Sequence, residues 1–204
     1  LQSSIFPRIY MIKPTPKQFK FVGNVEGWSV RFDSDMLITV DYHGGYHVYS
    51  YNDQGISEIA TAQIPAIAIR DTQIHDNTLW FSTHDDGIYV YSLEDPLNPQ
   101  QIFHLEIPGY LGKFALKDRI LVASRFFDRA PLRVYSYNTS GEYQEIAQFG
   151  NYYVEDLAFM GNFIVVVGRP TYYINGLLPV VFGIYGMEDP LNPYLIYEGP
   201  EPEY

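Results

Sequence analysis

The sequence predicts an all-β fold: a β-propeller of four-stranded antiparallel blades, with about four full blades and a half blade. The hexapeptide Glu-Asp-Pro-Leu-Asn-Pro occurs at Glu94–Pro99 and again at Glu188–Pro193. A strand-like segment with an aliphatic anchor followed by Tyr recurs five times, with anchors at Ile9, Val48, Val90, Val134 and Ile184. The anchors are spaced by 39, 42, 44 and 50 residues. That period is typical of propeller blades.

Each repeat unit contains the signals of four short strands. Polar hairpin tips come first, at Asp33–Asp35, His75–Asn77, Lys117–Asp118 and Gly161–Asn162. Each tip precedes a run rich in Val, Ile, Phe, Trp and Thr, at Met36–Val40, Thr78–Thr83, Arg119–Ala123 and Phe163–Val167. Such runs bounded by turn residues indicate strands. The anchor lies on a third strand, and a fourth is expected after the Pro or Gly turn, at Gln100–Glu106, Tyr143–Phe149 and Tyr194–Glu198.

No stretch of a dozen residues keeps a helical period without a Pro, a Gly or a β-branched run. We therefore expect one propeller domain over residues 1–204, or part of one. The repeats divide it into a half blade at 7–23 and blades at about 27–64, 66–108, 110–149 and 152–199. The incomplete first unit favours a fragment of a larger propeller whose half blade is completed by another segment. A small ring that closes on itself with an irregular blade is the alternative.

Composition excludes several classes of function. A net charge of −11 disfavours binding to nucleic acid, whose phosphates repel an acidic surface. No run of 18 apolar residues predicts a membrane-spanning helix, so membrane insertion is not expected. The absence of Cys removes thiol nucleophiles, disulfides and Cys-based zinc sites. The 19 Tyr residues favour packing between blades, with an aromatic binding surface as the alternative.

The segment Gly87–Gln100, with its Ile-Tyr-Val-Tyr-Ser-Leu strand and Glu-Asp-Pro-Leu-Asn-Pro turn, resembles the LVIVD repeat. The resemblance is sharp at Val90–Pro99 and Ile184–Pro193, and loose at Val48–Ile56 and Val134–Tyr143, which lack the Pro pair. It implies a β-propeller of a secreted or cell-surface protein, and it implies no defined activity. Asn138-Thr139-Ser140 is an N-glycosylation sequon in a predicted outer hairpin, and it also favours an extracellular location.

The loops between the second and third strands are the candidate binding sites. Two are minimal, at Asp41–Gly45 and His84–Gly87, and two are longer, at Arg125–Pro131 and Arg169–Pro179. Loops longer than the minimum commonly carry function, although a tolerated insertion or a contact between subunits is the alternative. The candidate binding residues on them are Arg125, Phe126, Phe127, Arg129, Arg169, Tyr172, Tyr173 and Asn175.

Three polar groups are weaker candidates. His43 with His84, Asp85 and Asp86 offers metal-ligand chemistry, but such residues are also ordinary hairpin tips. The Glu155–Asp156 pair offers acid–base chemistry, and an ion pair with Arg125 or Arg169 is the favoured interpretation. The repeated hexapeptide predicts a turn rather than a calcium loop, because Asp and Asn before Pro cap tight turns.

We therefore expect a non-catalytic module that binds a protein partner or self-assembles at a cell surface or outside the cell. No catalytic residue, metal or cofactor is assigned. The alternative is a hydrolase or lyase that acts on a carbohydrate or small molecule through an acidic site at the channel mouth.

Overall fold

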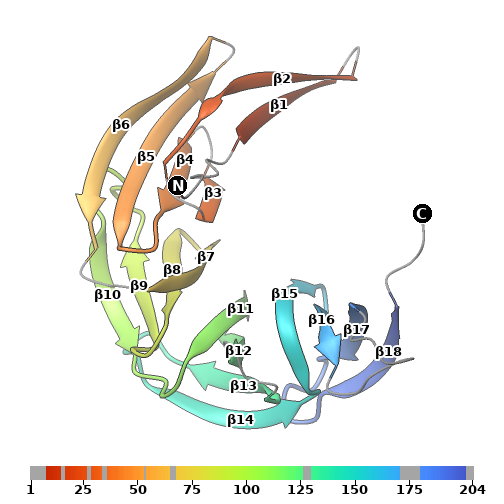
Figure 1. Cartoon of the computed structure of the whole chain (residues 1–204). Helices are drawn as coiled ribbons and strands as arrows, with labels where there is room; N and C mark the ends of the chain where they lie inside the picture. The colour runs from red at the N-terminus through yellow and green to blue at the C-terminus, as the bar shows by residue number, and fades with distance from the viewer. Residues whose placement is uncertain are drawn as a thin grey trace, which may run out of the picture. The chain divides into compact units, whose positions relative to one another are not determined.

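The computed structural model describes residues 8–14, 17–26, 29–33, 36–52, 54–64, 68–125, 130–170 and 180–200. Within these ranges the chain forms strands and turns and no helix. The strands pair antiparallel as one two-stranded sheet, β1–β2, and four four-stranded sheets, each of which we call a blade (Figure 1). Strands that follow one another in sequence are neighbours in every blade. This is the pattern that four strand signals per repeat predict.

The strand bounds follow the repeat. The two-stranded sheet consists of β1 (Arg8–Pro14) and β2 (Lys17–Asn24). The first two blades consist of β3 (Ser29–Asp33), β4 (Met36–Val40), β5 (Gly45–Asn52) and β6 (Gly55–Gln63), then β7 (Ile69–His75), β8 (Thr78–Thr83), β9 (Ile88–Ser92) and β10 (Gln100–Leu105). The last two consist of β11 (Leu111–Lys117), β12 (Ile120–Arg125), β13 (Leu132–Tyr137) and β14 (Tyr143–Phe149), then β15 (Tyr152–Met160), β16 (Phe163–Pro170), β17 (Val181–Gly186) and β18 (Tyr194–Pro200).

The predicted strands Met36–Val40, Thr78–Thr83 and Tyr143–Phe149 coincide with β4, β8 and β14. Others differ at one or both ends, and the largest difference is in β16, which continues to Pro170 instead of ending at Val167. The predicted hairpin tip at His75–Asn77 is a turn in which Asp76 and Asn77 have φ angles of 46° and 57°. Asp and Asn tolerate this left-handed conformation better than most residues. The tip at residues 33–35 lies partly outside the described residues.

The chain divides into two compact units. The first contains Leu1–Phe81 and Val90–Ile102, and the second contains Ser82–Tyr89 and Phe103–Tyr204. In the first unit, the main-chain N–H of Glu26 donates to the Tyr49 hydroxyl at 3.0 Å, and the Thr39 hydroxyl donates to the Glu26 carbonyl. Val25, Leu37 and Tyr49 form a small buried cluster beside these bonds.

The core of the second unit lies between its two complete blades. Side chains of β11–β14 and β15–β18 pack together there, and the buried set includes Val122, Leu132, Val134, Phe149, Leu157, Ile164, Val166, Val181 and Tyr185. Most of these residues are β-branched or aromatic, which suits a pleated surface buried against another sheet.

In the four complete blades the Tyr that follows the anchor packs inside the protein. Tyr49, Tyr91, Tyr135 and Tyr185 are all buried. The ring of Tyr185 lies 4.6 Å from that of Phe149 on the neighbouring blade. For this tyrosine the predicted role in packing between blades is confirmed.

A β-bulge recurs at the same step of the repeat. The strand register shifts between the anchor and the following Tyr at Ile9/Tyr10, Val48/Tyr49, Val134/Tyr135 and Ile184/Tyr185. The fourth strand holds the extra residue, and in three blades it is isoleucine, at Ile59, Ile146 and Ile196. A bulge bends the strand and increases its twist. The recurrence shows that the repeat extends to ladder geometry as well as to sequence.

Candidate functional site

The predicted binding loops are only partly within the described structure. Phe126, Phe127, Arg129, Tyr172, Tyr173 and Asn175 lie outside the described residues. Arg125 and Arg169, which end or nearly end β12 and β16, are described. The geometry of the candidate site is therefore built from these two arginines and the loops next to them in the second unit.

Arg125 lies beside Gly109, and the next residue, Tyr110, forms an aromatic pair with the partly buried His84 that the sequence alone does not predict. The ring of Tyr110 lies 4.2 Å from that of His84, and Tyr110 is 53% exposed. A Cβ built on Gly109, the residue before Tyr110, would lie 3.3 Å from Cζ of Arg125. We call His84, Gly109, Tyr110 and Arg125 the Tyr110 cluster.

The local chain explains how the cluster forms. His84 sits in the short loop from β8 to β9, where the Thr83 hydroxyl donates to the Gly87 carbonyl at 3.0 Å. Gly87 has φ +81°, and a Cβ there would lie 2.0 Å from the Leu105 carbonyl oxygen, so the loop packs tightly on the end of β10. Tyr110 follows Pro108-Gly109, and Gly109 has φ +100°. The only feature of the sequence that points to Tyr110 is its position directly after a Pro-Gly turn.

Asp86 stabilises its own loop. The Tyr89 hydroxyl donates to its carboxylate, and a ring nitrogen of His104 contacts its carbonyl oxygen. The rings of Tyr89 and His104 stack 4.0 Å apart with an interplanar angle of 12°. These contacts fix Asp86 within a packed hairpin.

The Asp41 carboxylate has a comparable role in the first unit. It accepts hydrogen bonds from the main-chain N–H groups of His43 and Gly45, at 2.7 and 2.9 Å. Within the described part of the chain, no group of three or more His, Asp or Glu side chains is arranged to hold a metal ion. The favoured interpretation of Asp41–Gly45 and His84–Gly87 as hairpin tips therefore agrees with the contacts.

The Glu155–Asp156 pair lies near the start of β15 and is exposed. Nε of Arg169 donates to the Glu155 carboxylate at 3.2 Å, and the two side chains are 46% and 45% exposed. The register shifts between Val154 and Asp156, so Glu155 is the extra residue of a bulge. The Asp156 carboxylate accepts the main-chain N–H of Leu157 at 3.0 Å. The predicted ion pair between Glu155 and Arg169 is confirmed, and it lies at the protein surface.

The two hexapeptides form the same turn. The Asp95 carboxylate accepts the main-chain N–H of Leu97 at 3.2 Å, and that of Asp189 accepts the N–H of Leu191 at 3.0 Å. Main-chain bonds of 3.0 Å from Asn98 to Asp95 and from Asn192 to Asp189 close both turns. The predicted turn is confirmed, since the Asp side chains serve the backbone.

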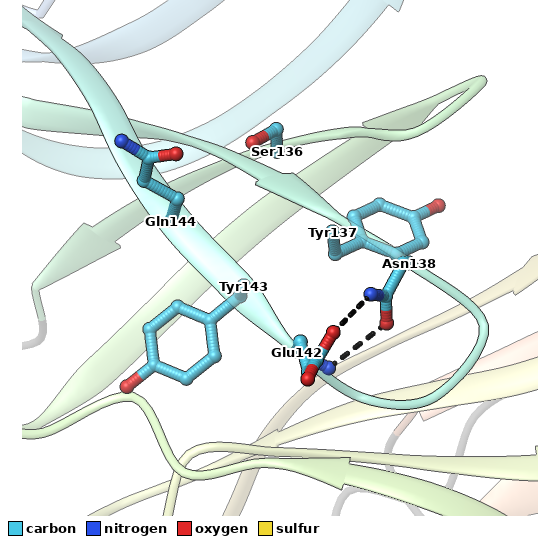
Figure 2. A pocket seen from close by; sticks show the side chains of 6 residues that line it. All are labelled: Ser136, Tyr137, Asn138, Glu142, Tyr143 and Gln144. Carbon is cyan, nitrogen blue, oxygen red and sulfur yellow. Dashed lines mark hydrogen bonds between the residues drawn. The ribbon is translucent and has the colours of Figure 1, made fainter.

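The hairpin between β13 and β14 carries the sequon and borders an open surface hollow of about 350 Å³ (Figure 2). Ser136, Tyr137, Asn138, Glu142, Tyr143 and Gln144 line it. The Asn138 amide donates to the Glu142 carboxylate at 2.6 Å, and its oxygen accepts the Glu142 main-chain N–H at 3.0 Å (Figure 2). The hydroxyls of Tyr137 and Tyr143 donate to the carbonyls of Asp118 and Glu106. The polar groups of this hollow therefore bond mainly to the protein itself.

A second hollow of about 210 Å³ lies between the two blades of the second unit, at their hairpin tips. Lys117 Nζ crosses between the tips and donates to the Gly161 carbonyl at 2.8 Å and to Asn162 Oδ1 at 2.6 Å. Ile120, Phe159 and Met187 contribute apolar walls. This lysine joins neighbouring blades, and its bonds give it a structural role.

No helix in the described ranges is long and apolar enough to cross a membrane. No family model matches the sequence, and no curated protein matches it. The LVIVD resemblance therefore stays a prediction.

Solved structures do match. A Bacteroides uniformis protein with a provisional assignment as a 6-phosphogluconolactonase has a TM-score of 0.71 at 11% identity, over 95% of this chain and 64% of its own. The chain has the fold of a β-propeller. A Lactobacillus plantarum protein matches with a TM-score of 0.69 at 12% identity, over 94% of this chain and 63% of its own. The computationally designed Ika4 protein matches with a TM-score of 0.56 at 13% identity, over 81% of this chain and 95% of its own.

These identities establish the fold alone. This propeller chain spans less than two thirds of the length of the two natural proteins. The predicted fold class, all-β with four-stranded antiparallel blades, is confirmed.

Proposed function

We propose that this chain is a non-catalytic binding module of an extracellular or cell-surface protein, and that it contacts a protein partner through the Tyr110 cluster and the loops beside it. The observation that carries the proposal is the pairing of exposed Tyr110 with His84, next to Gly109, which lies against Arg125. Tyr and Arg are common anchors in protein interfaces, because each combines a large contact area with hydrogen-bonding groups. The packed Gly87 loop holds the pair in place, which lowers the entropy lost on binding.

The polar chemistry elsewhere supports a binding role. Asp41, Asp95, Asp156 and Asp189 all bond to main-chain N–H groups. A carboxylate engaged in this way shapes a turn or strand end. Leu97, in the first hexapeptide turn, is exposed and is not part of the Tyr110 cluster, so its substitution offers a control.

The test compares variants of the full chain in binding to the surface proteins of the source organism. A partner recovered on the immobilised chain is purified, and its Kd is measured by calorimetry. We expect Tyr110→Ala and Arg125→Ala each to weaken binding by about tenfold or more, as truncation of an interface anchor does. Leu97→Ala is expected to bind as the wild type does. A purified partner that binds all three variants equally would place the interface elsewhere and overturn the assignment.

A second candidate is a hydrolase or lyase that acts on a carbohydrate or other small molecule. The exposed Glu155 carboxylate next to Arg169 favours it, because an acid or base needs access to substrate. The structural match to a protein provisionally assigned as a 6-phosphogluconolactonase gives one substrate to try. Turnover of 6-phosphogluconolactone or an aryl glycoside that is lost in Glu155→Gln would replace the binding proposal with this one. Absence of turnover across both substrate types would leave the binding role as the better account.

A further inference from the structure

The last blade, β15–β18, has one apolar face whose counterpart in the blade before it is buried. We call the face of β11–β14 that packs against β15–β18 its forward face, and we use the same name for the equivalent face of β15–β18. In β11–β14 the forward face contains Ala115, Val122, Leu132 and Val134, and all four are buried in the core of the second unit. They pack there against side chains of β15–β18 such as Leu157, Ile164 and Val166.

The repeat assigns the equivalent residues in β15–β18 without ambiguity. Ala115 pairs with Val122, and Val122 with Val134, across three adjacent strands. In the last blade Ala158 pairs with Val165, and Val165 with Ile184, in the same places. Phe182 lies two residues before its anchor, as Leu132 does before Val134. The forward face of the last blade is thus Ala158, Val165, Phe182 and Ile184.

This second forward face is apolar and accessible. Ala158 is exposed, and Val165, Phe182 and Ile184 are only partly buried. The face extends over the neighbouring pairs to Met160, Phe163 and Tyr197, which are 64%, 41% and 48% exposed. Its charged groups, Asp156 and the Glu155–Arg169 pair, gather at one end, near the start of β15 and the end of β16.

Burial at two equivalent positions differs between the last blade and the other three complete blades. The residue pairs at these two positions are Ile38 and Val48 in the first blade, Trp80 and Val90 in the second, and Val122 and Val134 in the third, and every one is buried. Among the complete blades, only β15–β18 has partly exposed residues there, Val165 and Ile184. Contiguous exposed apolar surface on a sheet commonly marks an interface.

We propose that the forward face of β15–β18 is the seat of a further four-stranded blade of the same repeat, supplied by additional sequence of a longer chain. The existing contact between β11–β14 and β15–β18 shows the side chains that such a blade would bring: small and aliphatic residues in the places of Leu157, Ile164 and Val166. The natural proteins of the same fold that match 94% and 95% of this chain are longer than it, since the matches cover only 63% and 64% of them. Chain beyond the matched part therefore accompanies this fold in other proteins.

Because the sequence contains no Cys, an introduced Cys is the single thiol of the chain, and its rate of labelling tests the exposure of the face directly. The full 204-residue chain is prepared as Val165→Cys and, as a matched control, as Val122→Cys, which lies at the equivalent position of the preceding blade. At low protein concentration we expect a maleimide to label Val165→Cys at least about tenfold faster than Val122→Cys, because reaction at the buried site requires local opening.

The second experiment adds a further blade to the C-terminal end of the described chain. The chain is extended after residue 200 with a second copy of residues 150–200, which keeps the two-residue connection found between β14 and β15. We expect labelling of Val165→Cys to slow to the rate of Val122→Cys. In a control extension, Leu157→Ser and Ile164→Ser are made in the added copy only, and labelling is expected to stay fast.

Every outcome decides the proposal. Slow labelling of Val165→Cys in the unextended chain would overturn it. If that rate depends on protein concentration, a second copy of the chain covers the face, and if it does not, another segment of the same chain does. Fast labelling that the unmodified extension fails to slow would also overturn it, whether the added copy folds elsewhere or remains unfolded.

Discussion

The hydroxyl oxygens of Tyr152 and Tyr185 lie 2.8 Å apart in the interior of the second unit. The Tyr152 hydroxyl also donates to the Glu198 carboxylate, so three strands of the last blade meet at one hydrogen-bonded group. Gly150 and Gly183 leave room for the Tyr152 side chain, since a Cβ on Gly150 would lie 2.6 Å from a ring carbon and a Cβ on Gly183 would lie 2.7 Å from the hydroxyl oxygen. Burial, followed by the bond to Glu198, raises the pKa of the Tyr152 hydroxyl far above its ordinary value of 10.0.

This raised pKa predicts a loss of stability in alkali. Below about pH 10 the hydroxyl is protonated in both folded and unfolded chains, so its bonds are fully retained. Above that pH the unfolded chain releases the proton while the folded chain keeps it, and the free energy of unfolding falls as pH rises. Tyr152→Phe should flatten this fall by an amount that grows through pH 10 toward about 1.4 kcal/mol per pH unit, the limiting linkage slope of one proton.

The measurement is urea unfolding between pH 8 and pH 11, followed by circular dichroism. Tyr110→Phe, at an exposed position, is the control for loss of one hydroxyl. An unchanged slope in Tyr152→Phe would show that this hydroxyl does not couple folding to alkaline pH.

Substitution by Ala should lower the free energy of unfolding by different amounts at Gly87 and at Gly161. Both have positive φ, at +81° and +61°. A Cβ on Gly87 would lie 2.0 Å from the Leu105 carbonyl oxygen, whereas a Cβ on Gly161 would meet nothing within 4 Å. We expect Gly161→Ala to cost about 1 kcal/mol, the cost of a left-handed residue alone, and Gly87→Ala to cost about 3 kcal/mol or more because backbone must move as well. Equal midpoints of urea unfolding would contradict the close packing of this loop.

The two hexapeptide turns predict additive effects, with the larger one at Asp189, whose carboxylate also accepts the Asn192 amide at 2.6 Å. Asp95→Ala and Asp189→Ala each remove an acceptor for a main-chain N–H, which should cost about 1 kcal/mol at Asp95 and more at Asp189. The sites lie in different repeats, so the double variant should lose about the sum. Glu94→Ala, which alters the neighbouring exposed charge, is the control and should change stability by less than about 0.5 kcal/mol. Chemical denaturation checks all four variants, and a large loss in Glu94→Ala would mean that the turn depends on more than its Asp.

Val122 and Val165 occupy equivalent positions and predict unequal cavity costs. Val122 is fully buried between blades, whereas Val165 is partly exposed. Val122→Ala should therefore cost about 2 kcal/mol and Val165→Ala about half as much. Differential scanning calorimetry of the two variants measures the difference. A larger loss in Val165→Ala would show that its face is covered in solution.

The repeat made most of the fold predictable, because blade strands are local in sequence and each carries its own signals. The Asp76–Asn77 tip and the Asp-Pro turns are set by residues within four positions of one another. Such features depend on backbone preferences that a short segment expresses by itself.

The bulges and the Tyr110 cluster were not predicted, and the reason is physical. The extra residue at Ile59 or Ile146 is defined only by its pairing with another strand. The Tyr110 ring meets His84 across two loops separated by 26 positions, so neither local pattern contains the contact. The ion pair of Glu155 with Arg169 was anticipated from charge, but the bulge that exposes Glu155 was not.

The bulges in the outer strands β6 and β18 have a consequence for behaviour at high concentration. Outer strands with exposed isoleucine at 59 and 196 would be ready templates for ladder growth by another chain if they were straight. An unpaired residue breaks the even spacing of hydrogen-bonding groups on β6 and β18, so an incoming strand cannot match them over its whole length. Deleting Ile59 or Ile196 would restore a regular edge, and solutions of such a chain would be expected to form fibrils where the parent stays dispersed.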